Sequence, residues 1–133
     1  MGKSMKNENE AIIRDEELRW LLNAIQEVAK TGIRPDGLYW RASYTPEDAA
    51  AVALLKSYME QAGMRVFFDA VGNLHGVLQG KSEQVIMAGS HRDTVRSGGK
   101  YDGMLGILSA ICSAGRLYQR LGQPEKTLEV VAI

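Results

Sequence analysis

Residues 103–121 place apolar side chains on nearly every side of the helix that their spacing predicts. These apolar residues are Met104, Leu105, Ile107, Leu108, Ala110, Ile111, Ala114 and Leu117. We expect such a helix to be buried rather than to lie on the surface. Segments 84–88 and 128–133, on either side of it, are each typical of a buried strand. This order predicts a βαβ unit with parallel strands and a right-handed crossover.

The first half of the chain predicts two helices followed by two strands. Residues 1–14 are polar and form a lead-in, and apolar residues at helical spacing predict a helix over about 16–30. A second helix is expected over 45–63, and strands over 64–69 and 74–78.

The second helix carries clear signals at both ends. Thr45 is a good N-cap, Pro46 suits the first helical position, and Asp48 is placed where a capping carboxylate belongs. Gly63 is the expected stop, because it can adopt the left-handed conformation that ends many helices.

Composition narrows the class of partner. The formal net charge is zero, with 45% hydrophobic and 24% charged residues, as in an ordinary soluble domain. We therefore expect no nucleic-acid or membrane partner, since these usually need a basic patch. The single cysteine, Cys112, fits a reducing cytoplasm, and residues 1–10 contain no apolar segment of a secretory signal.

A dense polar segment, 89–103, lies between the buried strand and the buried helix. His91 follows the carboxyl end of the strand, and Asp102 precedes the helix. Ligands of open α/β sheets bind outside the carboxyl ends of the strands, so we expect both side chains at one edge. Imidazole and carboxylate are ordinary metal ligands, and Asp93 could orient His91 through its second ring nitrogen.

Other interpretations of these side chains remain open. One His and two Asp in a loop are more often solvated polar residues than metal ligands. The other histidine, His75, lies within a predicted strand and is a weaker candidate.

Three motifs together resemble a known family. Segment 89–103 resembles the Gly-Ser-His-x-Asp-Thr-Val, Gly-Gly and Asp-Gly pattern of dinuclear metallohydrolases related to aminoacylases and zinc exopeptidases. Segment 69–74 is similar to the Asp-x-x-Gly-Asn-Leu of one branch, and helix 45–63 also matches it. That branch holds N-carbamoyl-L-amino acid hydrolases, allantoate amidohydrolases and β-ureidopropionases. The resemblance covers about 40–133.

The resemblance implies a fold and a set of roles. The fold is the N-terminal part of a three-layer α/β domain of the zinc-exopeptidase type with a mixed sheet. Residues 15–133 would form an incomplete catalytic domain, without the lid and dimerisation domain. His91 would bind one metal ion, Asp102 would bridge two ions, and Asp93 would orient His91. The cofactor would be two divalent ions of zinc, manganese or cobalt.

The implied activity is metal-dependent hydrolysis of a linear amide or ureido C–N bond, in an N-carbamoyl amino acid or in allantoate. The general base, further ligands and a dimer-forming domain are expected beyond Ile133, in a homodimeric parent. We therefore expect the chain alone to be inactive and poorly soluble, with the final strand presenting an exposed sheet edge.

Two departures and two rival functions remain. Arg92 stands where the family usually has an apolar residue, and we expect it at the rim of the pocket or in solvent. Val52 stands where the branch often has Arg. The rivals are a non-catalytic remnant or binding module, and an aminoacylase or exopeptidase of the same family.

Overall fold

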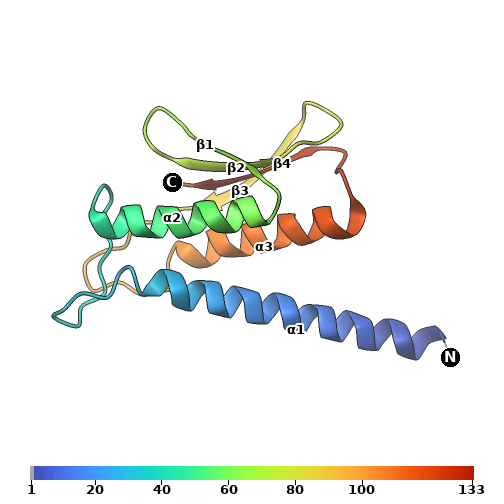
Figure 1. Ribbon diagram of the computed structural model, residues 1–133, viewed down its shortest axis with the longest axis horizontal. Coiled ribbons are helices and arrows are strands. Elements are labelled where there is room, and N and C mark those ends of the chain that lie inside the picture. The colour runs from blue at the N-terminus through green and yellow to red at the C-terminus, as the bar shows by residue number, and fades with distance from the viewer. Residues whose placement is uncertain (1) are drawn as a thin grey trace.

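The computed structural model describes the backbone of residues 2–133 and the side chains of residues 15–133. Three helices and four strands follow one another along this part of the chain (Figure 1). They are α1 (Gly2–Ala29), α2 (Pro46–Gln61), β1 (Arg65–Phe68), β2 (Leu74–Leu78), β3 (Val85–Ser90), α3 (Met104–Leu121) and β4 (Thr127–Ala132).

The strands form one mixed sheet in the order β1-β2-β4-β3. β3 and β4 are parallel and joined by α3, whereas β2 is antiparallel to both β1 and β4. Ala132 pairs with Ser90 on one side and with Leu74 on the other, so the carboxyl ends of β3 and β4 share one edge with the start of β2. The predicted α/β class, mixed sheet and βαβ unit are confirmed.

All three helices of the described chain lie on the same side of the sheet (Figure 1). α2 packs on β1 and β2, α3 packs on β3 and β4, and α1 packs against α3. The core fills the space between these layers, and its largest fully buried apolar side chains are Ile25, Leu55, Met59, Leu74, Met104, Ile107, Leu108, Ile111, Val28 and Val130.

The prediction that α3 is buried on nearly every side is wrong. Ile107 and Leu108 are fully buried, but Leu105 is 42% and Leu117 48% exposed. The buried residues of α3 recur at a spacing of three or four, which places them on one face of the helix, and α3 packs against the sheet, α1 and α2.

The predicted burial of β3 is also wrong. Val85, Ile86 and Met87 are 50%, 53% and 57% exposed. β3 is an edge strand, and the side of the sheet opposite the helices is uncovered in the described structure (Figure 1). The exposed edge expected at the final strand belongs to β3 instead, because β4 lies between β2 and β3.

α1 begins at Gly2 rather than near residue 16, and so continues through the predicted polar lead-in. Many residues there, such as Glu, Lys, Met and Ala, have high helix propensity. The side chains before Asp15 lie outside the described residues, and the division into 1–14 and 15–133 stays a prediction.

The ends of α2 agree with the sequence. Thr45 Oγ1 accepts the N–H of Asp48 at 3.3 Å, and Asp48 Oδ2 accepts the N–H of Tyr44 at 3.0 Å. Gly63 follows the helix with φ +85°, the left-handed conformation expected of it. None of the described helices has the length and apolar character needed to cross a bilayer.

The free edge of β3 generates a prediction about self-association. A lysine on an edge strand opposes pairing with a second edge, so Met87→Lys should weaken concentration-dependent association by about tenfold, or about 1.4 kcal/mol. Leu121→Lys, at an exposed position at the end of α3, is the matched control. Sedimentation velocity over a concentration series measures the effect, and equal association of both variants and the parent chain would contradict it.

Candidate metal centre

The βαβ unit brings His91 and Asp102 together from two ends of one loop. His91 follows the last residue of β3, and the N–H of Arg92 donates to Ile133 O at 2.9 Å, which extends the pairing with the β4 segment past the site. Asp102 precedes α3, which packs back on β3 and so returns the end of the loop to its start. Asp102 Oδ1 lies 3.7 Å from His91 Nε2, and Asp93 Oδ1 lies 3.3 Å from His91 Nδ1. The three side chains predicted from the sequence are therefore neighbours.

The tautomer of His91 follows from its hydrogen bond. Its Nδ1 lies 2.9 Å from the carbonyl oxygen of Asp93. A carbonyl oxygen only accepts, so Nδ1 must carry the proton that it donates. In a neutral imidazole this leaves the lone pair on Nε2, the nitrogen that faces Asp102. Asp93 thus contacts His91 Nδ1 through both its main-chain carbonyl oxygen and its carboxylate, and the orienting role expected of Asp93 stays a prediction.

These residues fit part of a metal centre. Two donors that each lie about 2.0–2.2 Å from one ion can be up to about 4 Å apart, which includes the observed 3.7 Å. Both side chains are more than two-fifths exposed, so a small ligand can reach them. From Asp15 onward, no group of three or more His, Cys, Asp or Glu side chains is placed to hold an ion. Residues 15–133 therefore offer two donors rather than a closed site.

Gly103 makes the approach of the two segments possible. It has φ +70°, a conformation that other residues rarely adopt. A Cβ at this position would lie 2.2 Å from the carbonyl oxygen of His91 and 2.6 Å from its Cε1. The Asp-Gly pair in the sequence thus combines a donor with the residue that lets its segment pass close to His91.

Arg92 does not lie at a pocket rim or in solvent, so both expectations for it are wrong. It is buried and forms a two-point ion pair with Asp48 of α2. Arg41 is also buried and donates to the carbonyl oxygen of Arg92. The sequence identified Asp48 only as a helix cap and gave no signal for Arg41, because an arginine in a polar loop is usually solvated.

The segment beginning at Asp69 forms a tight turn rather than part of the centre. Asp69 Oδ1 accepts the N–H groups of Val71 and Asn73 at 3.0 and 2.9 Å, and Gly72 has φ +89°. Hydrogen bonds from Asn73, first of all from its backbone N–H, with smaller contributions from Val71 and His75, lower the pKa of Asp69 from 3.8 to about 2.

His75 lies on β2 and contacts two carboxylates that are not part of the candidate centre. Its Nδ1 lies 2.7 Å from Glu129 Oε1, its Nε2 lies 3.4 Å from Asp69 Oδ2, and its ring stacks on Phe67. Because the two nitrogens face carboxylates on opposite sides, His75 links β2 to β4 and to the Asp69 turn.

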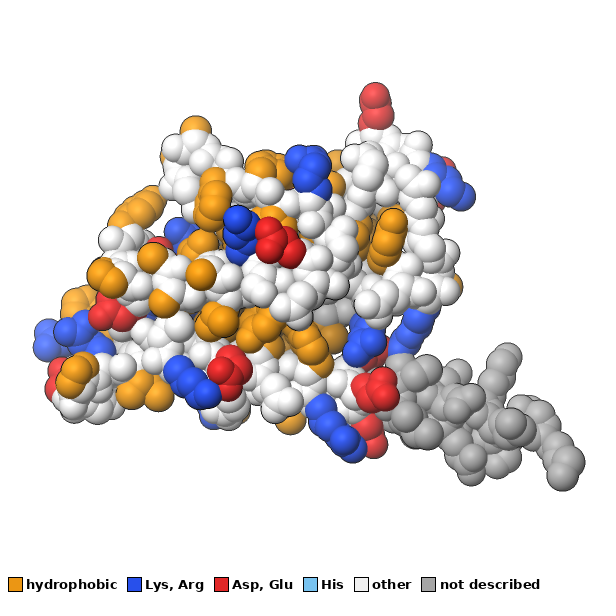
Figure 2. All heavy atoms as spheres, in the orientation of Figure 1, with side chains coloured by type: hydrophobic (Ala, Val, Ile, Leu, Met, Phe, Trp, Pro, Cys, Tyr) orange, Lys and Arg blue, Asp and Glu red, His pale blue; other side chains and the backbone are white. Residues whose placement is uncertain are grey.

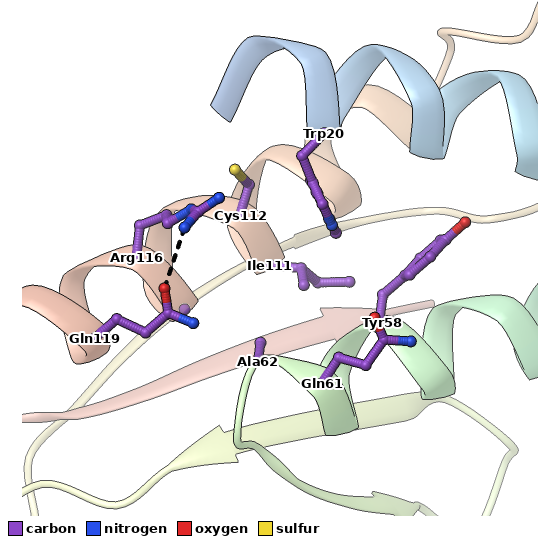
Figure 3. A pocket seen from close by; sticks show the side chains of 9 residues that line it. Trp20, Tyr58, Gln61, Ala62, Ile111, Cys112, Arg116 and Gln119 are labelled. Atoms are coloured by element: carbon purple, nitrogen blue, oxygen red, sulfur yellow. Dashed lines mark hydrogen bonds between the residues drawn. The ribbon is translucent and has the colours of Figure 1, made fainter. Parts of the chain in front are cut away.

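A separate pocket of about 200 Å³ lies between α1, α2 and α3 (Figure 3). Trp20 and Tyr58 project into it from α1 and α2, and Arg116 of α3 is hydrogen-bonded to Gln119 beside it. No histidine or carboxylate lines this pocket. Cys112 lines it, and burial raises the pKa of its thiol, which disfavours the reactive thiolate.

The face of the molecule drawn in Figure 2 has no region in which all charged side chains carry the same sign. Figure 2 shows Lys and Arg side chains interspersed with Asp and Glu and with hydrophobic groups. The expected absence of a nucleic-acid partner stays a prediction.

No protein-family model matches the chain, but individual proteins do. Allantoate amidohydrolase of Bacillus subtilis (strain 168) is 41% identical over 111 residues, which are 82% of this chain and 27% of the relative. N-carbamoyl-L-amino acid amidohydrolase of Geobacillus stearothermophilus is 40% identical over 93 residues, 68% of this chain and 23% of the relative.

Solved structures agree with these relatives. A hydantoinase/carbamoylase family amidase from Burkholderia ambifaria superposes with a TM-score of 0.80 at 31% identity, over 87% of this chain and 29% of that structure. The chain thus spans about a quarter of the length of the proteins that it resembles.

Substitution of Gly103 should show how much of the stability depends on its close contact with His91, apart from the backbone strain that any side chain would meet at this φ. We expect Gly103→Ala to cost about 3 kcal/mol or more of unfolding free energy, because it adds both strain and a contact with His91. Gly37→Ala is the matched control, with φ +81° and nothing within 4 Å of the added carbon, and should cost only about 1 kcal/mol. Urea denaturation measures both, and equal losses would show that the approach to His91 is not tight.

The Asp69 turn should make stability depend on pH in acid. The folded-state pKa of about 2 lies below the usual 3.8. The stabilisation is therefore present above about pH 4 and is lost as pH falls through about 2. Asp69→Asn should flatten this part of the curve of urea midpoint against pH. An unchanged slope between pH 4 and pH 2 would refute the assignment.

Proposed function

This chain belongs to the hydantoinase/carbamoylase family of amidases, of whose members it spans about a quarter, and on this premise we propose that it forms part of a metal-dependent amidohydrolase. The substrate class is a small molecule with a linear amide or ureido C–N bond, of the allantoate or N-carbamoyl amino acid type. The observation that carries the proposal is His91, whose Nδ1 is fixed by Asp93 and whose Nε2 faces Asp102.

Each of the three residues has a distinct task in this proposal. The Nε2 of His91 and the carboxylate of Asp102, which lie 3.7 Å apart, would hold the divalent metal. Asp93 keeps the proton of His91 on Nδ1, so that Nε2 stays available as a donor. Bound divalent ions supply Lewis acidity and lower the pKa of water in such enzymes.

The chain itself is proposed to be inactive. His91 and Asp102 are two donors, and no third His, Cys, Asp or Glu joins them within residues 15–133. A catalytic metal site usually has three protein ligands and an open position. The same observation favours a second candidate, a non-catalytic remnant or binding module that keeps the fold without turnover.

The other parts of the proposal rest on the resemblance of segments 69–74 and 89–103 to the family pattern. The ions are zinc, manganese or cobalt, the whole protein is a cytoplasmic homodimer, and the substrate is closer to a ureido acid than to a peptide. An aminoacylase or exopeptidase activity is the competing assignment, and the choice of substrate in the assay distinguishes them.

A chimera tests the function directly. The 111 matched residues of the B. subtilis allantoate amidohydrolase are replaced by the corresponding residues of this chain. We expect metal-dependent hydrolysis of allantoate or an N-carbamoyl amino acid. His91→Asn and Asp102→Asn should each lower kcat/KM by about 10³-fold, or about 4 kcal/mol, and reduce the bound metal.

The control uses the second histidine. His75→Gln removes an imidazole outside the proposed centre and should keep metal content and kcat, even where thermal stability falls. A folded chimera that binds metal but hydrolyses none of these substrates would favour the remnant, and peptide hydrolysis alone would favour the exopeptidase assignment.

A further inference from the structure

We infer that the buried ion pair of Arg92 with Asp48, supported by Arg41, is a positioning device that holds His91 in its donor orientation. The inference rests on the proposed function, because it concerns the residue that would bind the metal.

Arg92 joins three separate elements beneath the site. Its Nε and Nη2 donate to the two carboxylate oxygens of Asp48 at 2.8 and 3.3 Å. Its Nη1 donates to the carbonyl oxygens of Gly72 and Ala132, each at 3.1 Å. One guanidinium thus connects the start of α2, the turn between β1 and β2, and the end of β4. All four donations come from a residue that is 6% exposed.

Because Arg92 follows His91 directly, the anchoring of Arg92 sets the side to which His91 points. In an extended segment, successive side chains point to opposite sides. With Arg92 directed into the protein, His91 and Asp93 project to the other side, where His91 Nδ1 meets the carbonyl oxygen and carboxylate of Asp93. Without the Arg92–Asp48 ion pair, the backbone of residues 91–93 can rotate. The contact between His91 Nδ1 and the carbonyl oxygen of Asp93, which fixes the ring, is then lost.

Arg41 fixes the same segment from a second direction. Its Nε donates to Arg92 O at 2.9 Å, and its N–H and carbonyl oxygen pair with Thr94 Oγ1 and Thr94 N–H, both at 2.8 Å. The Arg41 side chain is fully buried, and its Nη2 has no hydrogen-bond partner among the described residues. Burial of a guanidinium with one unpaired nitrogen costs desolvation free energy, so Arg41 is placed for its contacts with Arg92 and Thr94 rather than for net stability.

Arg41 and Arg92 do not help the proposed site by attracting the metal ion. Cationic side chains next to a proposed cation site repel the ion, and only the charge of Arg92 is offset by a carboxylate. The contribution of Arg41 and Arg92 is therefore orientation of the His91 segment.

The test separates orientation from stability. Replacing a buried ion pair by apolar residues of similar volume is often neutral for stability, so the double variant Arg92→Leu/Asp48→Leu should stay folded, at a stability reduced by loss of the hydrogen bond from Tyr44 N–H to Asp48. The readout is the tautomer of His91, observed in long-range ¹H–¹⁵N spectra of the labelled chain, with every variant at one fixed pH of about 8. The parent chain should show one tautomer, with the proton on Nδ1, and the double variant a mixture of both.

A matched pair and a second variant complete the design. Arg120→Leu/Glu17→Leu removes the exposed Arg–carboxylate pair between α3 and α1 and should leave the His91 signal unchanged. Arg92→Lys keeps a charge beside Asp48 but cannot reproduce the fork of four hydrogen bonds, so it should also give a mixture. This variant decides the question if the double variant unfolds.

Each outcome has one meaning. A single Nδ1–H tautomer retained in a folded double variant, or in Arg92→Lys if the double variant unfolds, would overturn the inference. A parent chain whose His91 carries its proton on Nε2 would instead remove the donor geometry on which the proposed function rests. If a chimera that carries the Arg92 substitution loses its metal while the tautomer of His91 is unchanged, Arg92 has a different role, and the inference is also overturned.

Discussion

The parallel pairing of β3 with β4 is the constraint on which the candidate centre depends. Parallel strands need a crossover, and α3 provides it along one side of the sheet. The loop between β3 and α3 must therefore leave the carboxyl end of β3 and return to the same edge. His91 and Asp102 lie at the two ends of that loop, and Gly103 removes the side chain that would keep them apart. The two donors thus lie together because of the βαβ topology and because Gly103 has no side chain.

A second set of interactions gives the first residue of the loop its direction. The carbonyl oxygen of Asp93 fixes the proton on His91, and Arg92 and Asp48 hold the backbone between them beneath the surface. A buried ion pair contributes little net stability, since desolvation offsets most of the attraction. What it provides is a geometric requirement, because two oxygens of Asp48 and two carbonyl oxygens must be met at once.

The uncovered surfaces and the two-donor centre are consistent with each other. β3 exposes three large apolar side chains at the sheet edge, α3 exposes Leu105 and Leu117, and the centre has two donors where a catalytic site uses three. All three features occur in a chain that spans about a quarter of the length of its relatives. The chain holds the loop of the proposed site in a defined geometry, while the proposed chemistry needs groups that are not among its described residues.

The sequence by itself determined the local elements and the candidate residues. Capping by Thr45 and Asp48, the strand and helix periods, and the Asp-Gly pair depend on interactions within a few residues, which a sequence displays directly. The tertiary structure decided the burial of β3 and α3, because burial depends on which neighbours cover an apolar segment. It also decided the role of Arg92: its partners Asp48, Gly72 and Ala132 are distant in the chain, and only the packing of α2 against the sheet brings them to one guanidinium.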